Sequence, residues 1–144
     1  MDASWEEDNL CFTKVKYMNC MGETIVAIIA SPLEIKAKLL AGIVAMPGTS
    51  SSAEEVMNRK LYRPKPETGP LLGWGRELAK KGYVVISFSP KGTTQRRITS
   101  ENWEKETKLL APYGISPIGI LVDEVIRTAL VLTSINGERF YGLS

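Results

Sequence analysis

The last three residues of the chain, Gly142-Leu143-Ser144, match the start of a Gly-x-Ser-x-Gly motif. In that motif the serine lies on a sharp turn between a strand and a helix, and its hydroxyl attacks a carbonyl carbon. A serine hydroxyl needs an adjacent base, usually histidine, and the sequence contains no histidine. The motif therefore predicts Ser144 as a nucleophile whose acid and base are encoded beyond it. A chance Gly-x-Ser triplet is the alternative.

A second candidate is the loop Pro47-Gly48-Thr49, which follows an apolar run at residues 39–46. Gly48 would let a substrate approach the backbone, and the Thr49 N–H would then hold the oxyanion of a tetrahedral intermediate. Loss of one such donor costs about 3 kcal/mol of transition-state stabilisation. The alternative is an ordinary strand-to-helix turn, in which Ser52 and Glu55 form a capping box. The residues do not decide between the two.

Asp123 and Arg127 are spaced to form an ion pair on consecutive turns of a helix. A role for Asp123 as a triad acid is less consistent with the motif, because there the acid follows the serine along the chain. The basic residues at 59–60 and 96–97 could form a phosphate site, but their loops are polar and predict a solvated surface role.

Composition excludes several classes of function. The chain has 144 residues, of which 44% are hydrophobic and 24% charged, and its net charge of +2 does not favour nucleic acid or an anionic membrane as partner. No apolar run is long enough for a membrane span, and the acidic residues 1–8 do not resemble a signal peptide, so a cytoplasmic location is expected. Without histidine, a Cys-x-x-Cys pair or a phosphate-binding glycine motif, we expect no metal or cofactor. Cys11 and Cys20 are expected to be free thiols.

Hydrophobic periodicity predicts an α/β domain over residues 1–144. An antiparallel hairpin comes first, and strands then alternate with helices, which indicates a mostly parallel sheet with flanking helices. The expected strands are 13–18, 24–30, 39–46, 83–88 and 138–143. One expected helix begins at residue 53, and three others cover residues 71–81, 101–110 and 118–132. Ligands bind beyond the carboxyl ends of the strands in such sheets. Residues 47–52, residues 89–94 and Ser144 should therefore converge.

These segments together resemble the amino-terminal half of α/β hydrolases of the dienelactone hydrolase and acetyl xylan esterase-like group. The similar segments are Pro47-Gly48-Thr49, residues 52–56, residues 75–85 and residues 114–132. The resemblance implies a partial α/β-hydrolase fold, truncated at the nucleophile elbow, with Ser144 as nucleophile. Two departures are visible: Pro47 replaces a usual histidine, and residues 89–92, Ser-Pro-Lys-Gly, replace a common Asp-x-Arg-Gly.

The function that follows is a fragment of a serine hydrolase, which cleaves a small-molecule carboxylic ester through an acyl-enzyme intermediate. Such a fragment is expected to be inactive alone. The alternative is a non-catalytic α/β domain that binds a small ligand or a protein partner through the same crevice. The sequence does not determine the acyl group, the alcohol or the oligomeric state.

Overall fold

The computed structural model describes residues 3–34, 40–48, 51–65, 69–92, 96 and 108–141, with side chains up to residue 135. Five strands form one mixed sheet: β1 (Ala3–Glu7), β2 (Leu10–Met18), β3 (Thr24–Pro32), β4 (Gly42–Ala45) and β5 (Val84–Phe88). Their spatial order is β1-β2-β3-β5-β4. Within the described residues only β4 and β5 pair in parallel, whereas β3 pairs with β5 antiparallel. The expected mostly parallel sheet is therefore a mixed one, because β5 inserts between the hairpin and β4.

The predicted hairpin is confirmed as β2 and β3, which pair along nine residues from Leu10↔Pro32 to Met18↔Thr24. Strand β1 was not predicted. It is acidic and largely exposed, and it joins β2 through Asp8 and Asn9, both of which have positive φ. Two such residues between strands are typical of a type I′ hairpin turn, so the Asp-Asn pair was the signal that sequence reasoning missed.

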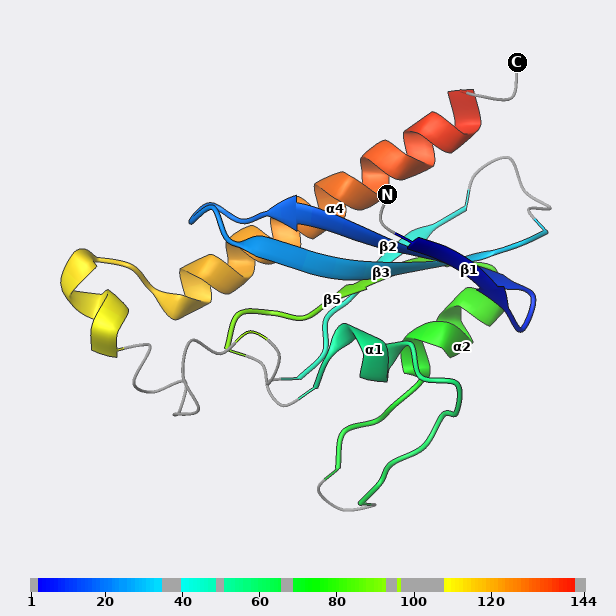
Figure 1. Ribbon diagram of the computed structural model, residues 1–144, viewed down its shortest axis with the longest axis horizontal. Helices are drawn as coiled ribbons and strands as arrows, with labels where there is room; N and C mark the ends of the chain where they lie inside the picture. The colour runs from blue at the N-terminus through cyan, green and yellow to red at the C-terminus, as the bar shows by residue number, and fades with distance from the viewer. Residues whose placement is uncertain are drawn as a thin grey trace.

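Helices cover both faces of the sheet (Figure 1). On one face, α1 (Ala53–Val56) and α2 (Trp74–Lys80) pack on a core that includes Leu10, Phe12 and Val85. On the other face lies α4 (Pro117–Tyr141). Its Leu132 joins a second core with Ile25, Ile86, Phe88 and other strand residues. Alternate residues of β5 thus serve the two cores, which explains why its sequence is apolar except for Ser87.

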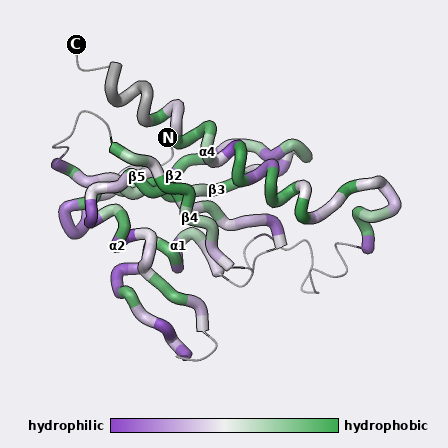
Figure 2. The backbone as a smooth tube through the Cα atoms, turned by 180° about the vertical axis from the view of Figure 1, so that it is seen from behind, coloured by the Kyte–Doolittle hydropathy of each residue, from purple (hydrophilic) through white to green (hydrophobic). Residues whose placement is uncertain are grey.

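Residues 58–65 and 69–72 form the two sides of a long excursion below α1 and α2 (Figure 1). The sequence predicts an exposed loop over residues 58–70; residues 59–65 are exposed, whereas Gly69 is buried and Asn58 and Pro70 are half-buried. Figure 2 shows hydrophilic residues on the described sides of this excursion and hydrophobic strands at the centre of the molecule. Its two sides meet in one isolated antiparallel bridge between Tyr62 and Leu72.

The expected helix at 53 is confirmed with its capping box: Ser52 Oγ accepts from the Glu55 N–H at 3.3 Å, and Glu55 Oε2 accepts from the Ser52 N–H at 2.8 Å. The expected helix 71–81 is confirmed as α2, which is shorter and covers Trp74–Lys80. Of the expected helix 101–110, residues 108–110 are helical and precede the 3-10 helix η1 (Ala111–Tyr113), whereas 101–107 lie outside the described residues.

The expected strand 138–143 is wrong as far as Tyr141, because α4 continues to that residue. We expected Asn136-Gly137 to turn the chain. An Asn-Gly pair directs a tight turn when strands flank it on both sides, and here a helix precedes it. Inside a helix, Gly costs only about 1 kcal/mol relative to Ala, so the helix passes through. In the described part of the chain, no helix combines the length and apolar composition needed to cross a membrane.

Both cysteines are free thiols. Cys11 lies near the start of β2 and Cys20 follows its end, so the extended strand separates them by more than about 20 Å. A disulfide requires Cα atoms within about 7 Å. The two thiols therefore cannot bridge within one folded chain.

Candidate active site

The loop after β4 begins at Met46 and passes through buried Pro47 to exposed Gly48. The Ser51 N–H donates to the Gly48 carbonyl at 2.9 Å and closes a turn. A Cβ built on Gly48 would meet no atom within 4 Å. Packing against the described residues therefore does not require glycine at this position, and its backbone is open to an approaching molecule. Thr49 lies outside the described residues.

The loop after β5 is tied to the loop after β4. Ser89 Oγ, just past the end of β5, accepts a hydrogen bond from the Ala53 N–H at 3.1 Å. This contact holds the start of α1 beside the carboxyl end of β5. Two of the three segments expected to converge are therefore brought together. The third, Ser144, lies outside the described residues, so its position stays a prediction.

A buried carboxylate positions the loop after β5. Glu124 of α4 is completely buried, and its Oε2 accepts from the Lys91 N–H at 3.0 Å. Its Oε1 lies 2.8 Å from Arg96 Nη1 and accepts from Asn19 Nδ2 at 3.0 Å. The same carboxylate thus joins the β2–β3 turn, α4 and the segment that follows β5.

The expectation of a solvated Arg96 is wrong: its side chain is 13% exposed and also donates to the Ser89 carbonyl at 3.1 Å. Lys91 is buried too, and its Nζ pairs with Glu23. The polar loop composition suggested solvent, but the partners lie on distant elements. A carboxylate on the otherwise apolar face of helix 118–132 was the signal for a buried counter-ion. Arg97 lies outside the described residues.

Neighbouring hydrogen-bond donors and positive charges lower the pKa values of two acidic side chains, Glu23 and Asp123. Desolvation acts to raise the pKa of Glu23, but hydrogen bonds from Lys91 and Asn19 and the charge of Arg96 outweigh it, so the pKa is lowered. The pKa of Asp123 is lowered as well, because the Cys20 N–H and Arg127 outweigh desolvation. The predicted Asp123–Arg127 ion pair is confirmed at 2.8 Å.

The other predicted basic pair behaves as expected in its described part. Arg59 is 69% exposed and pairs with Glu7 at 2.8 Å. Lys60 is also exposed. Both side chains are exposed and Arg59 already pairs with a carboxylate, so these two residues do not favour a phosphate site.

A cavity of about 320 Å³ opens beside the loop after β4. Its lining is mostly apolar and comes from that loop, the end of the excursion and the start of α2: Pro47, Gly48, Ser51, Pro70, Leu71 and Trp74. The side chain of Ser51 is buried, and its Oγ has no hydrogen-bond partner among the described residues. The Ser51 Oγ has almost no accessible surface, so the walls that the cavity presents are mostly apolar.

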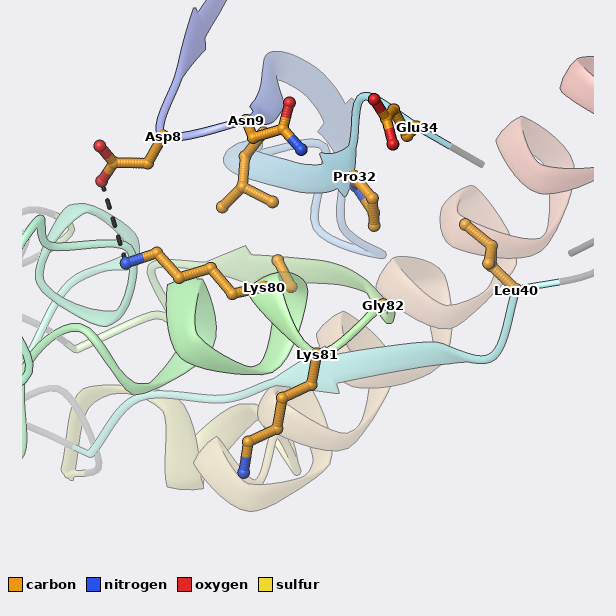
Figure 3. A pocket seen from close by; sticks show the side chains of 10 residues that line it. Asp8, Asn9, Pro32, Glu34, Leu40, Lys80, Lys81 and Gly82 are labelled. Atoms are coloured by element: carbon orange, nitrogen blue, oxygen red, sulfur yellow. Dashed lines mark ion pairs between the residues drawn. The ribbon is translucent and has the colours of Figure 1, made fainter. Parts of the chain in front are cut away.

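A second cavity, of about 430 Å³, lies near the opposite ends of β4 and β5 (Figure 3). Asp8 and Lys80 approach to 3.9 Å at its rim, while Lys81 points away from them. Ligands of open α/β sheets bind at the carboxyl ends of the parallel strands, so this cavity is in the wrong place for the predicted chemistry. Among the described residues, no group of three or more acidic or cysteine side chains could hold a metal ion.

This chain resembles a known protein in its fold but matches none by sequence. Neither the family models nor the curated protein sequences match this chain. Its fold does match a crystal structure from Bacteroides fragilis, provisionally named an acetyl xylan esterase, with a TM-score of 0.65 and 14% sequence identity. The chain adopts part of an α/β-hydrolase fold. The match covers 86% of this chain but only 35% of that structure, and at this identity it establishes the fold alone.

Proposed function

We propose that this chain forms the amino-terminal part of a serine hydrolase that cleaves carboxylic esters through an acyl-enzyme intermediate. The observation that carries the proposal is the opening at Gly48, which lies beside a cavity at the carboxyl end of β4 in a partial hydrolase fold. Substrates bind at this end of the parallel strands in such sheets. The remaining residues of the proposed site are Thr49 and Ser144.

Each residue of the site has one chemical role. Ser144 Oγ attacks the ester carbonyl carbon and gives its proton to a general base supplied from outside these 144 residues. The Thr49 N–H donates to the oxygen as negative charge develops on it, and the open backbone at Gly48 admits that oxygen. The alcohol then leaves, and water releases the acyl group from Ser144.

Two exposed surfaces support the idea that more structure packs on this part of the fold. The outer edge of β4 has no partner strand among the described residues. Along α4, four aliphatic side chains at four-residue spacing are 52–70% exposed: Ile118, Val122, Ile126 and Leu130. Unpaired strand edges and aliphatic stripes of this kind are normally covered in stable proteins.

The test is covalent labelling of the intact protein that contains this chain. A fluorophosphonate should label the protein, mass spectrometry should place the adduct on Ser144, and Ser144→Ala should abolish it. The coding sequence after Ser144 should supply a residue and then glycine, with an acid and a histidine further on.

A folded protein that resists labelling would reject the nucleophile assignment. The same cavity would then support the second candidate, a non-catalytic domain that binds a small ligand. Pro47, which replaces the histidine usual in the resembled enzymes, favours that candidate.

A further inference from the structure

Helix α1 is too short to hold its own position. It has four residues, about one turn, and a helix of that length is not stable without tertiary contacts. Its capping box is internal, because Ser52 and Glu55 satisfy N–H groups of their own segment. Its buried residues, Ala53 and Val56, pack on the core, but apolar packing is non-directional. A directional contact from another element is therefore needed to fix α1 and the residues 47–52 before it.

Ser89 supplies a contact of this kind. It is 3% exposed and directly follows β5, and its Oγ accepts from the Ala53 N–H at 3.1 Å. Ala53 is the first residue of α1, where an N–H has no acceptor within the helix. The hydrogen bond joins residues that are 36 positions apart in the sequence. It therefore fixes the start of α1 against the carboxyl end of β5.

The backbone of Ser89 is in turn fixed from the side of α4. Its carbonyl accepts from Arg96 Nη1 at 3.1 Å, and the same nitrogen lies 2.8 Å from the buried carboxylate of Glu124. The other oxygen of that carboxylate accepts from the Lys91 N–H at 3.0 Å. The segment after β5 is therefore bound on one side to α4 and, through Ser89 Oγ, on the other side to α1.

We propose that Ser89 is a positioning residue for ester cleavage, because it transfers the position fixed by Arg96 and Glu124 to residues 47–52. The inference rests on the proposed function, in which Thr49 of that loop donates to the oxyanion. Such a donor stabilises the transition state only if it is aimed at the oxygen as charge develops. A misplacement of about 1 Å can lower the rate about 10²-fold. Ser89 thus acts on the reaction through the loop and does not touch the substrate.

The first measurement is the hydrolysis of p-nitrophenyl acetate by the intact protein that contains this chain. Ser89→Ala should lower kcat about tenfold, because the donor remains but its loop is less well fixed. KM should stay unchanged, because the donor acts in the transition state. Ser89→Thr keeps the Oγ acceptor and should retain the parent kcat.

Ser87→Ala is the matched control. Ser87 lies on the same strand, and its buried Oγ has no hydrogen-bond partner among the described residues. The same chemical change there should leave kcat unchanged. Thermal unfolding shows which variants are folded. If Ser89→Ala does not fold, Ser89→Cys replaces it, because the thiol has a similar shape and its sulfur is only a weak acceptor.

The second measurement does not depend on turnover. Amide hydrogen exchange is followed at Ala53, which donates to Ser89 Oγ, and at Ser51, which donates to the Gly48 carbonyl within the loop. Ser89→Ala should accelerate exchange at both N–H groups. Ser87→Ala should leave both rates unchanged.

The outcomes separate this inference from the proposed function. In a protein that hydrolyses the ester, an unchanged kcat or unchanged exchange in Ser89→Ala would overturn the positioning role. An equal fall of kcat in Ser87→Ala would also overturn it, since the cause would then be a general loosening of β5. If the parent neither hydrolyses the ester nor reacts with the fluorophosphonate, the proposed function fails and the positioning role fails with it. Faster exchange in Ser89→Ala would then show a structural contact alone.

Discussion

Glu124 provides the strongest test of how this fold holds the loop after β5. Its carboxylate is fully buried and accepts hydrogen bonds from Arg96, Asn19 and the Lys91 N–H. Glu124→Gln keeps the size of the side chain but removes the charge that balances Arg96. It also turns one acceptor oxygen into an NH₂ group, which faces a donor. The substitution therefore leaves Arg96 with the more exposed Glu23 carboxylate, at 3.4 Å, as its counter-ion, and leaves at least one buried donor without a partner.

The expected loss can be bounded from these contacts. Removal of one partner of a buried ion pair costs about 3–5 kcal/mol. The Arg96 side chain is 13% exposed, and it keeps its bond to the Ser89 carbonyl and its ion pair with Glu23, so the lower end, about 3 kcal/mol, is the appropriate figure. A domain of ordinary stability has about 5–15 kcal/mol in total. A loss of this size is large enough to measure.

The assay is urea unfolding followed by circular dichroism, with Glu77→Gln as control. Glu77 pairs with Lys80 at 3.0 Å, but its side chain is 38% exposed, and such pairs contribute less than about 1 kcal/mol. The double variant Glu124→Gln, Arg96→Met should recover part of the loss, because the unbalanced charge is gone. If Glu124→Gln were no more destabilising than Glu77→Gln, the proposed role of the buried carboxylate would be wrong.

Three further predictions address other buried groups. Ser87→Ala should raise the free energy of unfolding by about 1 kcal/mol, because it removes a buried hydroxyl with no partner among the described residues; an increased urea midpoint would show this. Burial raises the pKa of Tyr17 from 10.0 to about 12. The unfolded chain therefore ionises first, so stability should fall as pH rises between these values, and Tyr17→Phe should remove that part of the pH dependence. Arg76 donates to Glu7, to Asp8 and to a backbone carbonyl while 5% exposed. Arg76→Lys should cost about 1–3 kcal/mol in thermal unfolding, because lysine cannot make these contacts together, and an unchanged melting temperature would contradict this role.

Local patterns were sufficient for much of the fold. The capping box at Ser52, α2 and the Asp123–Arg127 pair depend on residues within a few positions of one another, and the β2–β3 hairpin follows from alternation within each strand and the short turn between them. The spacing of residue types along the sequence is enough to predict such interactions. The same patterns predicted that the loops after β4 and β5 would meet, since parallel strands end at one edge of the sheet.

Long-range contacts decided the rest. Nothing local to Arg96 indicated burial, because its partner Glu124 lies 28 residues later on another element. The cavity beside Gly48 is likewise built by three segments, and only their packing shows that the Ser51 hydroxyl is enclosed without a partner.

The sequence by itself determined most of the strands and helices, although not β1 or the end of α4, and it determined which residue types could carry acyl chemistry. The tertiary structure decided whether the sheet is mixed, how far α4 extends and which polar groups are buried. The physical reason is that hydrophobic period and capping act over one or two turns of chain, whereas desolvation depends on every element that packs around a group. Burial is therefore a property of the assembled fold, and it is the reason that Ser87 and Glu124 are chosen for experiment.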